Sequence, residues 1–265
     1  MTIVLINFAD ENFEKQRDLN TLSAKLFGGF DKVLSFSKEQ IESGFYEKNH
    51  LILNEKRGAG YWLWKPYFID KVLNELSDGD YLFYCDAGCI FINNVKHLIR
   101  VLDDSGQSIM SFELPLVEYE WTAESVLNEF DAYKKGYAQS NQISATYLLL
   151  KKSNDSVRLI KDWLEKCTRA ELLTDDANLG NIAKAHRHDQ SIFSLIIKSE
   201  GYKTFKDPSD YGRFPWRYFT KDRYFNLKEY ESNYPVILLS NRKENAIKYL
   251  VKYYIRSLLQ IMRIK

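Results

Sequence analysis

The chain has 265 residues, of which 45 % are hydrophobic and 28 % are charged, and its formal net charge is +1. This length and composition are typical of a soluble globular protein with a substantial core, and they exclude a disordered chain. A net charge this small excludes a protein built to coat nucleic acid.

Short apolar runs alternate along the chain with segments of helical periodicity. The runs are rich in β-branched or aromatic residues, and several are apolar at every position, as in strands covered on both faces. In chain order, the predicted strands are 2–9, 32–36, 81–91, 108–114 and 145–152, and the predicted helices are 11–27, 66–77, 95–103, 122–132, 154–170 and 188–200. This alternation predicts an α/β fold with a mainly parallel sheet and helices on both of its faces.

The segment 241–265 differs from the rest of the chain in charge. From residue 242 onward it carries seven cations against one acid, a local net charge of +6, and its apolar residues recur at helical spacing. This pattern predicts a basic amphipathic helix, which either lies on an anionic membrane surface or docks on the protein with a solvated basic face. We therefore divide the chain into a main domain, 1–240, and a C-terminal helix, 241–265.

Cysteine usage and the first residues bear on the compartment. The three cysteines, Cys85, Cys89 and Cys167, form neither a disulfide framework nor a metal-ligand spacing, and they indicate buried thiols in a reducing compartment. The opening residues MTIVLINFADENF lack the basic segment and the long apolar run of a signal peptide. No stretch approaches the roughly 20 apolar residues of a membrane span. We expect a cytoplasmic protein.

One acidic residue interrupts an apolar strand. Asp86 lies within YLFYCDAGCIF (81–91), and a buried carboxylate is costly unless a cation, backbone amides or a metal pairs with it. Ala87 and Gly88 follow and leave room for a ligand to approach the backbone. A strand-end Asp that only stabilises a turn is the structural alternative. We favour a functional carboxylate, because apolar residues flank Asp86 on both sides.

The stretch RGAGYWLWKP (57–66) combines glycines, cations and tryptophans ahead of a predicted helix. Gly58 and Gly60 permit close approach of the backbone, and Arg57 and Lys65 add positive charge near a helix N-terminus, a combination that suits a diphosphate. The tryptophans Trp62 and Trp64 fit the wall of a sugar or base site. They fit a packed corner of the core equally well.

A third polar cluster begins the helix predicted at 188–200. The segment HRHDQS (186–191) contains two of the four histidines of the chain, next to Asp189. An Asp at this place is first of all a helix N-cap. A His-Asp pair at a helix N-terminus also offers a base, a metal ligand or an acceptor for a hydroxyl group.

Taken in this order, RGAGYWLWKP, DYLFYCDAG (80–88) and HRHDQSIFSL (186–195) resemble bacterial nucleotide-sugar-dependent glycosyltransferases of the GT-A type, which occur in capsule and O-antigen (lipopolysaccharide) biosynthesis. The segments EYEWTAESV (118–126) and ISATYLLLKKS (143–153) also look similar to these enzymes. The resemblance covers roughly residues 1–240 and implies a GT-A-like, Rossmann-like fold.

The resemblance also implies roles for individual residues. GT-A enzymes carry an Asp-x-Asp motif at the acidic strand end, which binds the ribose of the donor and a divalent cation that neutralises the leaving diphosphate. Here Asp86 takes the first acidic place, but Gly88 stands at the second. A cation, Mn²⁺ or Mg²⁺, would be held by Asp86, the donor phosphates and His188 or His186. Alternatively, Arg57 and Lys65 replace the cation as a clamp.

The first strand end is where such enzymes hold the nucleobase, and Asp189 resembles the acid that faces the donor sugar and the acceptor hydroxyl. As a general base, Asp189 would accept the proton of the acceptor, and His188, Glu118 and Glu120 are rivals for that role. The donor site implied by the resemblance comprises Asn7, Phe8, Asp10, Arg57, Gly60, Trp64, Lys65, Asp86, Ala87, Gly88 and Gln190.

These patterns predict a cytoplasmic glycosyltransferase that transfers a sugar from a nucleotide-sugar donor, a UDP-sugar being expected, to a hydroxyl of a growing, lipid-linked surface glycan. The basic helix would hold it at the inner face of the membrane, and no nucleic-acid partner is expected. Two other classes stay open, a non-catalytic carbohydrate-binding protein and a nucleotidyltransferase. The acid in the strand argues against the first, and the lack of a Gly-rich phosphate loop near the first strand argues against the second.

Overall fold

The computed structural model describes residues 1–219, 225–230, 233–241 and 244–263. A seven-stranded mixed sheet forms its centre, in the order β2-β1-β3-β7-β5-β6, with β8 paired to β5. Five of the seven strands run in one direction, because only β6 and β7 are antiparallel to their neighbours. The strands are β1 (Ile3–Phe8), β2 (Lys32–Phe36), β3 (Tyr81–Cys85), β5 (Ile109–Val117), β6 (Asn141–Ile143), β7 (Tyr147–Lys151) and β8 (Thr204–Phe205).

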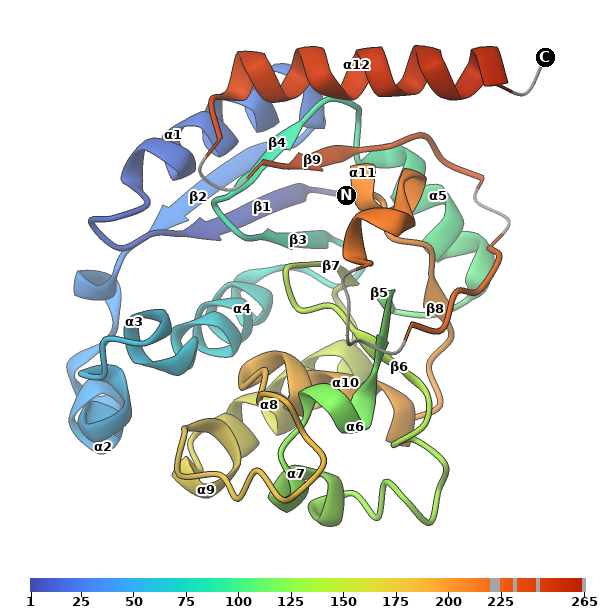
Figure 1. Cartoon of the computed structure of the whole chain (residues 1–265). Helices are drawn as coiled ribbons and strands as arrows, with labels where there is room; N and C mark the ends of the chain where they lie inside the picture. The colour runs from blue at the N-terminus through green and yellow to red at the C-terminus, as the bar shows by residue number, and fades with distance from the viewer. Residues whose placement is uncertain (220–224, 231–232, 242–243, 264–265) are drawn as a thin grey trace.

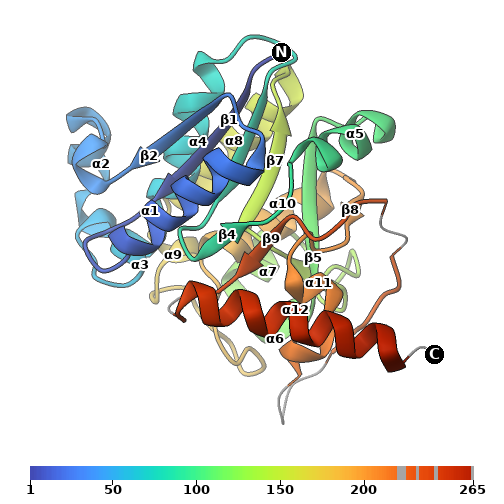
Figure 2. The ribbon, with the colours of Figure 1, turned by 90° about the horizontal axis from the view of Figure 1, so that it is seen from above.

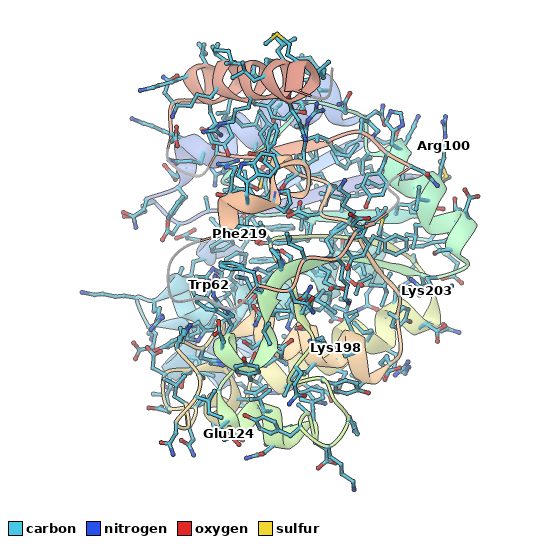
Figure 3. All side chains as sticks on the ribbon, turned by 45° about the vertical axis from the view of Figure 1, so that its right-hand side comes forward. Trp62, Arg100, Glu124, Lys198, Lys203 and Phe219 are labelled. Carbon is cyan, nitrogen blue, oxygen red and sulfur yellow. The ribbon has the colours of Figure 1, made fainter. Side chains whose placement is uncertain are left out.

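The central strands are apolar on both faces because both faces are covered. Side chains alternate along each strand, so that Ile3 and Leu5 of β1 belong to one core cluster and Val4 and Ile6 to the other. One face packs against α4 (Trp64–Glu75), α8 (Asn154–Cys167) and α10 (Asp189–Ser199), and the other against α1 (Glu14–Ser23) and α5 (Lys96–Ser105). Figure 1 shows the two layers on either side of the sheet, and side chains fill the space between them (Figure 3). The prediction of a mainly parallel sheet covered on both faces is confirmed.

The predicted strand 81–91 is two strands. β3 ends at Cys85, and β4 (Cys89–Phe91) pairs with β9 (Leu238–Ser240) in a separate two-stranded sheet. A turn separates the two strands, in which the Cys89 N–H donates to the Asp86 carbonyl at 3.2 Å. Periodicity could not reveal this break, because both strands are apolar and only the turn residues interrupt them. Asp86 therefore lies at the carboxyl end of a central strand.

The predicted helices are present, with shifted ends. The segment predicted at 11–27 is α1 followed by a π-helical turn, and the segment predicted at 154–170 is α8 followed by α9 (Ala170–Leu173). Between 122 and 132 only α7 (Glu124–Glu129) is helical. The remaining elements are η1 (Ala24–Gly28), η2 (Lys38–Gln40), α2 (Ser43–Leu53), α3 (Gly58–Tyr61), α6 (Glu118–Trp121), α11 (Asp210–Arg213), η3 (Pro215–Tyr218) and α12 (Ala246–Arg263).

The predicted C-terminal helix is α12, which Figures 1 and 2 show beside β9 and α11. Tyr249 and Tyr253 bury one side of α12 against Phe214 and Leu239, and the Tyr249 hydroxyl donates to Asp210 Oδ2 at 2.7 Å. The separation into a domain 1–240 and a helix 241–265 stays a prediction. Three of the cations counted in the sequence lie outside the described residues, namely Arg242, Lys243 and Lys265. Among the described helices, none is both long and apolar enough to span a bilayer.

Candidate active site

Strand alternation directs Asp86 toward the α4 and α10 side of the sheet. Asp86 follows Tyr84 by two residues, and Tyr84 belongs to the core cluster on that face. The Tyr84 hydroxyl donates to Asp86 Oδ1. The Asp86 side chain is 35 % exposed, so that a polar ligand can reach its carboxylate from solvent.

Lys65 reaches the same place from the first turn of α4. Its Nζ lies 2.8 Å from Asp189 Oδ2 and 3.6 Å from Asp86 Oδ1, and it donates to the Ala145 carbonyl at 3.0 Å. The Lys65 side chain is 4 % exposed, and its aliphatic stem brings the ammonium over the Tyr84 ring, 5.3 Å from the ring centroid. The ammonium therefore lies buried between two carboxylates that come from different elements.

Burial and charge compete in setting the protonation of this pair. Burial alone lowers the pKa of Lys65, but the carboxylates of Asp189 and Asp86 outweigh burial and raise this pKa. Burial raises the pKa of Asp189 to about 6, and the nearby Lys65 ammonium opposes that rise. At neutral pH, Lys65 is protonated and Asp189 is ionised, which makes the contact an interior ion pair.

Helix α10 holds Asp189 by its backbone. Asp189 is the first residue of α10, where the helix dipole favours a negative charge, and the Trp163 indole N–H donates to the Asp189 carbonyl at 2.9 Å. The next residue, Gln190, accepts from the Ala145 N–H at 3.2 Å and donates to Gln142 Oε1 at 2.8 Å. The backbone carbonyl and N–H of Ala145 thus link Lys65 of α4 to Gln190 of α10.

The two histidines of HRHDQS are buried and neutral at pH 7. Burial, helped by the nearby His188, lowers the pKa of His186 to about 4, and burial also lowers the pKa of His188. His186 Nε2 lies 2.8 Å from the Leu172 carbonyl, and its Nδ1 accepts from the Ala123 N–H at 3.3 Å. His188 Nδ1 donates to the Leu173 carbonyl at 2.7 Å, and within the described residues its Nε2 is buried without a hydrogen-bond partner.

The stretch RGAGYWLWKP folds mainly onto the protein itself. The backbone is left-handed from Gly58 to Trp62, and a Cβ on Gly60 would lie 2.8 Å from the Cα of Leu53. Gly60 thus serves chain packing, and the close approach of a ligand there stays a prediction. Arg57 is half exposed and binds Asp175 through both carboxylate oxygens, at 2.8 and 2.9 Å.

The aromatic side chains of this stretch divide between core and surface. The Trp64 ring stacks on Phe8 with centroids 3.7 Å apart, and its indole N–H donates to the Gly58 carbonyl at 2.9 Å. Trp64 and Phe8 are therefore core residues rather than ligand walls. Trp62 is only partly buried and stacks on His188 at 5.5 Å. Lys65 is also enclosed and forms an ion pair with Asp189, and its direct contact with a diphosphate stays a prediction.

At the end of β1, only one of the residues expected around a nucleobase is accessible. Asn7 is buried, and its Nδ2 donates to Asn20 Oδ1 at 2.8 Å and to Thr21 Oγ1 at 3.0 Å, which fixes β1 to α1. Asp10 is partly exposed and accepts from the Asn12 N–H at 3.0 Å. Near the β3 turn, Ala87 is buried and Gly88 is partly exposed.

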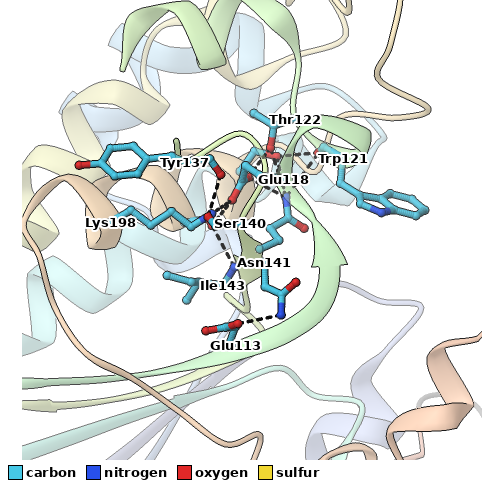
Figure 4. A network of polar contacts seen from close by, with 12 residues as sticks. Glu113, Glu118, Trp121, Thr122, Tyr137, Ser140, Asn141, Ile143 and Lys198 are labelled. Atoms are coloured by element: carbon cyan, nitrogen blue, oxygen red, sulfur yellow. Dashed lines mark hydrogen bonds and ion pairs between the residues drawn. The ribbon is translucent and has the colours of Figure 1, made fainter. Parts of the chain in front are cut away.

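A second polar network includes side chains of α10 and contains Glu118, one of the two glutamates considered as bases (Figure 4). Glu118 is fully buried and pairs with Lys198, and it accepts from Thr122 at 2.5 Å and from Ser194 at 2.6 Å. Glu120 is buried as well and pairs with Lys184 at 3.0 Å. Gln142 connects this network to Gln190, since its Nε2 lies 3.3 Å from Glu118 Oε1.

The residues present do not fit the divalent cation that the resemblance implies. Within the described part of the chain, no three His, Cys, Asp or Glu side chains gather as a metal site. Asp86 already accepts from the Tyr84 hydroxyl and faces the Lys65 ammonium, and Gly88 supplies no side-chain oxygen. The assignment of Asp86 and His188 as metal ligands stays a prediction.

The sequence did not point to three groups that complete the site: the Tyr84 hydroxyl, the Ala145 carbonyl and the Gln142 amide. Tyr84 could have been found from its spacing of two residues from Asp86 in a strand. A polar groove of about 460 Å³, lined by Asp103, Lys151 and Glu200 among others, lies at the opposite end of β3 and contains none of the predicted site residues.

Three solved structures illustrate what the chain is similar to. The apo form of mouse xyloside xylosyltransferase 1 matches with a TM-score of 0.50 and 10 % identity over 91 % of this chain and 97 % of that chain. The chain has a GT-A-like fold. The galactosyltransferase LgtC, in complex with donor and acceptor sugar analogs, matches at a TM-score of 0.47 and 13 % identity over 92 % of this chain and 88 % of its own.

A glycosyltransferase involved in glycosylation of the major capsid of PBCV-1 matches the GT-A-like chain at a TM-score of 0.48 and 10 % identity over 96 % of this chain and 100 % of its own. No protein-family model matches this sequence, and a search of curated proteins finds no match. The likeness therefore lies in the fold, while the function has to be argued from the site.

Proposed function

We propose that this chain is a glycosyltransferase that moves a sugar from a nucleotide-sugar donor, a UDP-sugar in the first instance, to a hydroxyl of a growing surface-polysaccharide glycan of the capsule or O-antigen kind. The observation that carries the proposal is the buried Lys65 ammonium between Asp86 and Asp189, at the carboxyl end of β3. Ligands of open α/β sheets bind at this edge. The GT-A-like fold, shared with a protein named as a xylosyltransferase, supports the same activity.

In the proposed reaction, Asp86 binds the donor, because its side chain is the exposed member of the trio. The acceptor oxygen forms a bond to C1 of the sugar, the bond from C1 to the diphosphate oxygen breaks, and the acceptor proton moves to a base. Asp189 is the proposed base, since its pKa of about 6 leaves it ionised at neutral pH and still able to take a proton. His188 is the rival, because its neutral ring has an unpartnered Nε2.

We test the activity with nucleotide sugars directly. Purified chain is screened by thermal shift against UDP-, GDP- and CMP-sugars, and hits are followed by release of the free nucleotide diphosphate or monophosphate. A ligand at 100 times its Kd stabilises by about 2.7 kcal/mol, which raises Tm by several degrees. Asp86→Asn should abolish both binding and turnover. If Asp86→Asn still binds the nucleotide sugar, and neither this variant nor the unmodified chain turns it over, the result favours a carbohydrate-binding protein. If the unmodified chain binds no nucleotide sugar, the proposal is overturned.

A second part of the proposal places the enzyme on the cytoplasmic face of a membrane through α12. The side of α12 away from Tyr249 and Tyr253 exposes a row of apolar residues, and a basic stripe of Lys248, Lys252 and Arg256 runs beside that row. Such a surface matches a bilayer with anionic headgroups, where apolar side chains insert and cations meet lipid phosphates. The free cysteines are buried, which is consistent with a reducing compartment. The exposed apolar residues are Ile247, Val251, Tyr254, Ile255, Leu258, Leu259, Ile261 and Met262.

Vesicle sedimentation tests this surface. The chain should bind vesicles that contain anionic lipid and should leave neutral vesicles in the supernatant. The double variant Ile255→Gln and Leu258→Gln should lose binding, while Leu51→Gln, which removes an even more exposed apolar side chain from α2, should retain it. Equal binding of all variants, or no binding by the parent chain, refutes the role of α12.

A further inference from the structure

The Lys65 ammonium has three acceptors around it, and two of them carry negative charge. Asp189 Oδ2 lies at 2.8 Å, the Ala145 carbonyl at 3.0 Å and Asp86 Oδ1 at 3.6 Å. The ammonium donates a hydrogen bond to the Ala145 carbonyl, and its positive charge pairs with both carboxylates. The side chain is enclosed by protein, and it cannot turn out to solvent without leaving Asp189 buried and unpaired.

This arrangement places a positive charge next to the carboxylate that a metal would use. A divalent cation bound at Asp86 would lie within a few ångströms of the ammonium, and like charges at such distances repel strongly in a protein interior. A hard cation also prefers several oxygen ligands, while Asp86 Oδ1 is already bound by the Tyr84 hydroxyl and Gly88 supplies none. Both effects act against metal binding at this end of β3.

We propose that Lys65 is a built-in cation that takes the place of the divalent metal at Asp86 and Asp189, so that the donor binds and reacts without a metal. This inference rests on the proposed transferase function. Lys65 acts as a positioning residue: it balances the two carboxylates and holds Asp86 toward the donor.

The first test uses the unmodified chain. Titration of Mn²⁺, followed by the EPR signal of the free ion, should show no protein-bound Mn²⁺ in the absence of nucleotide. The Kd of the UDP-sugar that the screen identifies should agree within about twofold between buffer with EDTA and buffer with Mn²⁺, because the site gains no ligand from the metal. Binding that occurs only with Mn²⁺ overturns the inference and leaves the proposed function intact. Absence of binding in both buffers overturns the proposed function itself.

The second test asks whether Mn²⁺ can replace the Lys65 ammonium. Lys65→Met keeps the approximate volume of the side chain but leaves the carboxylates of Asp86 and Asp189 without a positive partner. This variant should gain a Mn²⁺ site with a Kd of about 0.1 to 1 mM, in the range of weak carboxylate sites. Lys65→Arg keeps the charge and should bind no Mn²⁺. Lys71→Met removes a partly exposed lysine of the same helix, paired with Glu42, and should bind none either.

The inference can be tested even if Lys65→Met folds poorly, because Mn²⁺ binding by the unmodified chain is an independent test. Mn²⁺ bound by the unmodified chain and lost in Asp86→Asn refutes the inference. Mn²⁺ bound by Lys65→Met and removed again by Asp189→Asn supports it, since both carboxylates are then shown to hold the ion. If Lys65→Met folds and binds no Mn²⁺, the result counts against the inference that the Lys65 ammonium takes the place of a divalent metal.

Discussion

The ammonium of Lys65 and the carboxylate of Asp189 form an ion pair of 2.8 Å inside the protein, although they come from helices that lie far apart in the sequence. The pair joins the N-terminal turns of α4 and α10 beneath the end of β3. Asp86, which is accessible from solvent, lies on the outer side of the pair. The stability of the fold and the charge of the proposed site therefore depend on the same three side chains.

Removal of Lys65 should destabilise the fold in a pH-dependent way. Lys65→Met should lower the free energy of unfolding by about 3 to 5 kcal/mol at pH 8, because Asp189 stays buried without a partner. The loss should be smaller at pH 5, where Asp189 takes up a proton and no longer carries an unpaired charge. Urea unfolding at both pH values measures the difference. Lys71→Met is the exposed control, for which we expect a change within about 0.5 kcal/mol.

Turnover should decrease as the pH falls through 6. The pKa of Asp189 is about 6, so acidification neutralises the proposed base. Asp189→Asn should lower turnover by about 10² to 10⁴-fold and remove the acidic limb of the profile. His188→Gln should leave that limb in place. If His188→Gln removes the limb and Asp189→Asn retains it, His188 is the base.

The same pKa fixes the sign of a stability effect. The folded pKa of Asp189 lies above the ordinary value of 3.8, so the folded chain holds a proton between about pH 4 and 6 that the unfolded chain has released. The contribution of Asp189 to stability therefore decreases as the pH rises through that interval. Asp189→Asn should show a flatter dependence of unfolding free energy on pH between 4 and 6 than the unmodified chain, as measured by urea unfolding.

Two glycines should respond to alanine in opposite ways. Gly60 has a φ of 101°, and a Cβ there would lie 2.8 Å from the Leu53 Cα, so Gly60→Ala should cost more than about 1 kcal/mol of stability. Gly44 lies in α2 with open space around it, and Gly44→Ala should add about 0.5 to 1 kcal/mol. Thermal unfolding of both variants checks the pair. Similar shifts in Tm would contradict the tight packing at Gly60.

Glu118 should act on stability and leave the pH dependence of activity unchanged. It is fully buried and pairs with Lys198, so Glu118→Gln should cost about 3 to 5 kcal/mol. The exposed pair of Glu42 with Lys71 supplies the control, and Glu42→Gln should change the stability by less than about 1 kcal/mol. A shifted pH profile in folded Glu118→Gln would instead make Glu118 part of the proton transfer.

The sequence determined the layers of the fold, because hydrophobic periodicity is a local property of the chain. The runs at 2–9, 32–36 and 145–152 each contain a strand of the central sheet, and the segments beginning at 154 and 188 contain α8 and α10. The sequence also singled out Lys65, Asp86 and Asp189 as candidate site residues, and Asp86 stood out because an acid in an apolar strand requires a partner.

Only the tertiary structure decided which group is the partner of Asp86 and which side chains are open to a ligand. Pairing between α4, β3 and α10 depends on how the helices pack on the sheet, and the spacing of residues in the chain does not contain that information. Packing enclosed Lys65, Trp64, Phe8 and Asn7, which the sequence assigned to donor binding, and it left Asp86 exposed. The sequence does not reveal whether the ammonium group of a lysine lies in solvent or in the interior, because the long aliphatic stem permits both positions. Here the carboxylates of Asp86 and Asp189 stabilise the Lys65 ammonium in the interior.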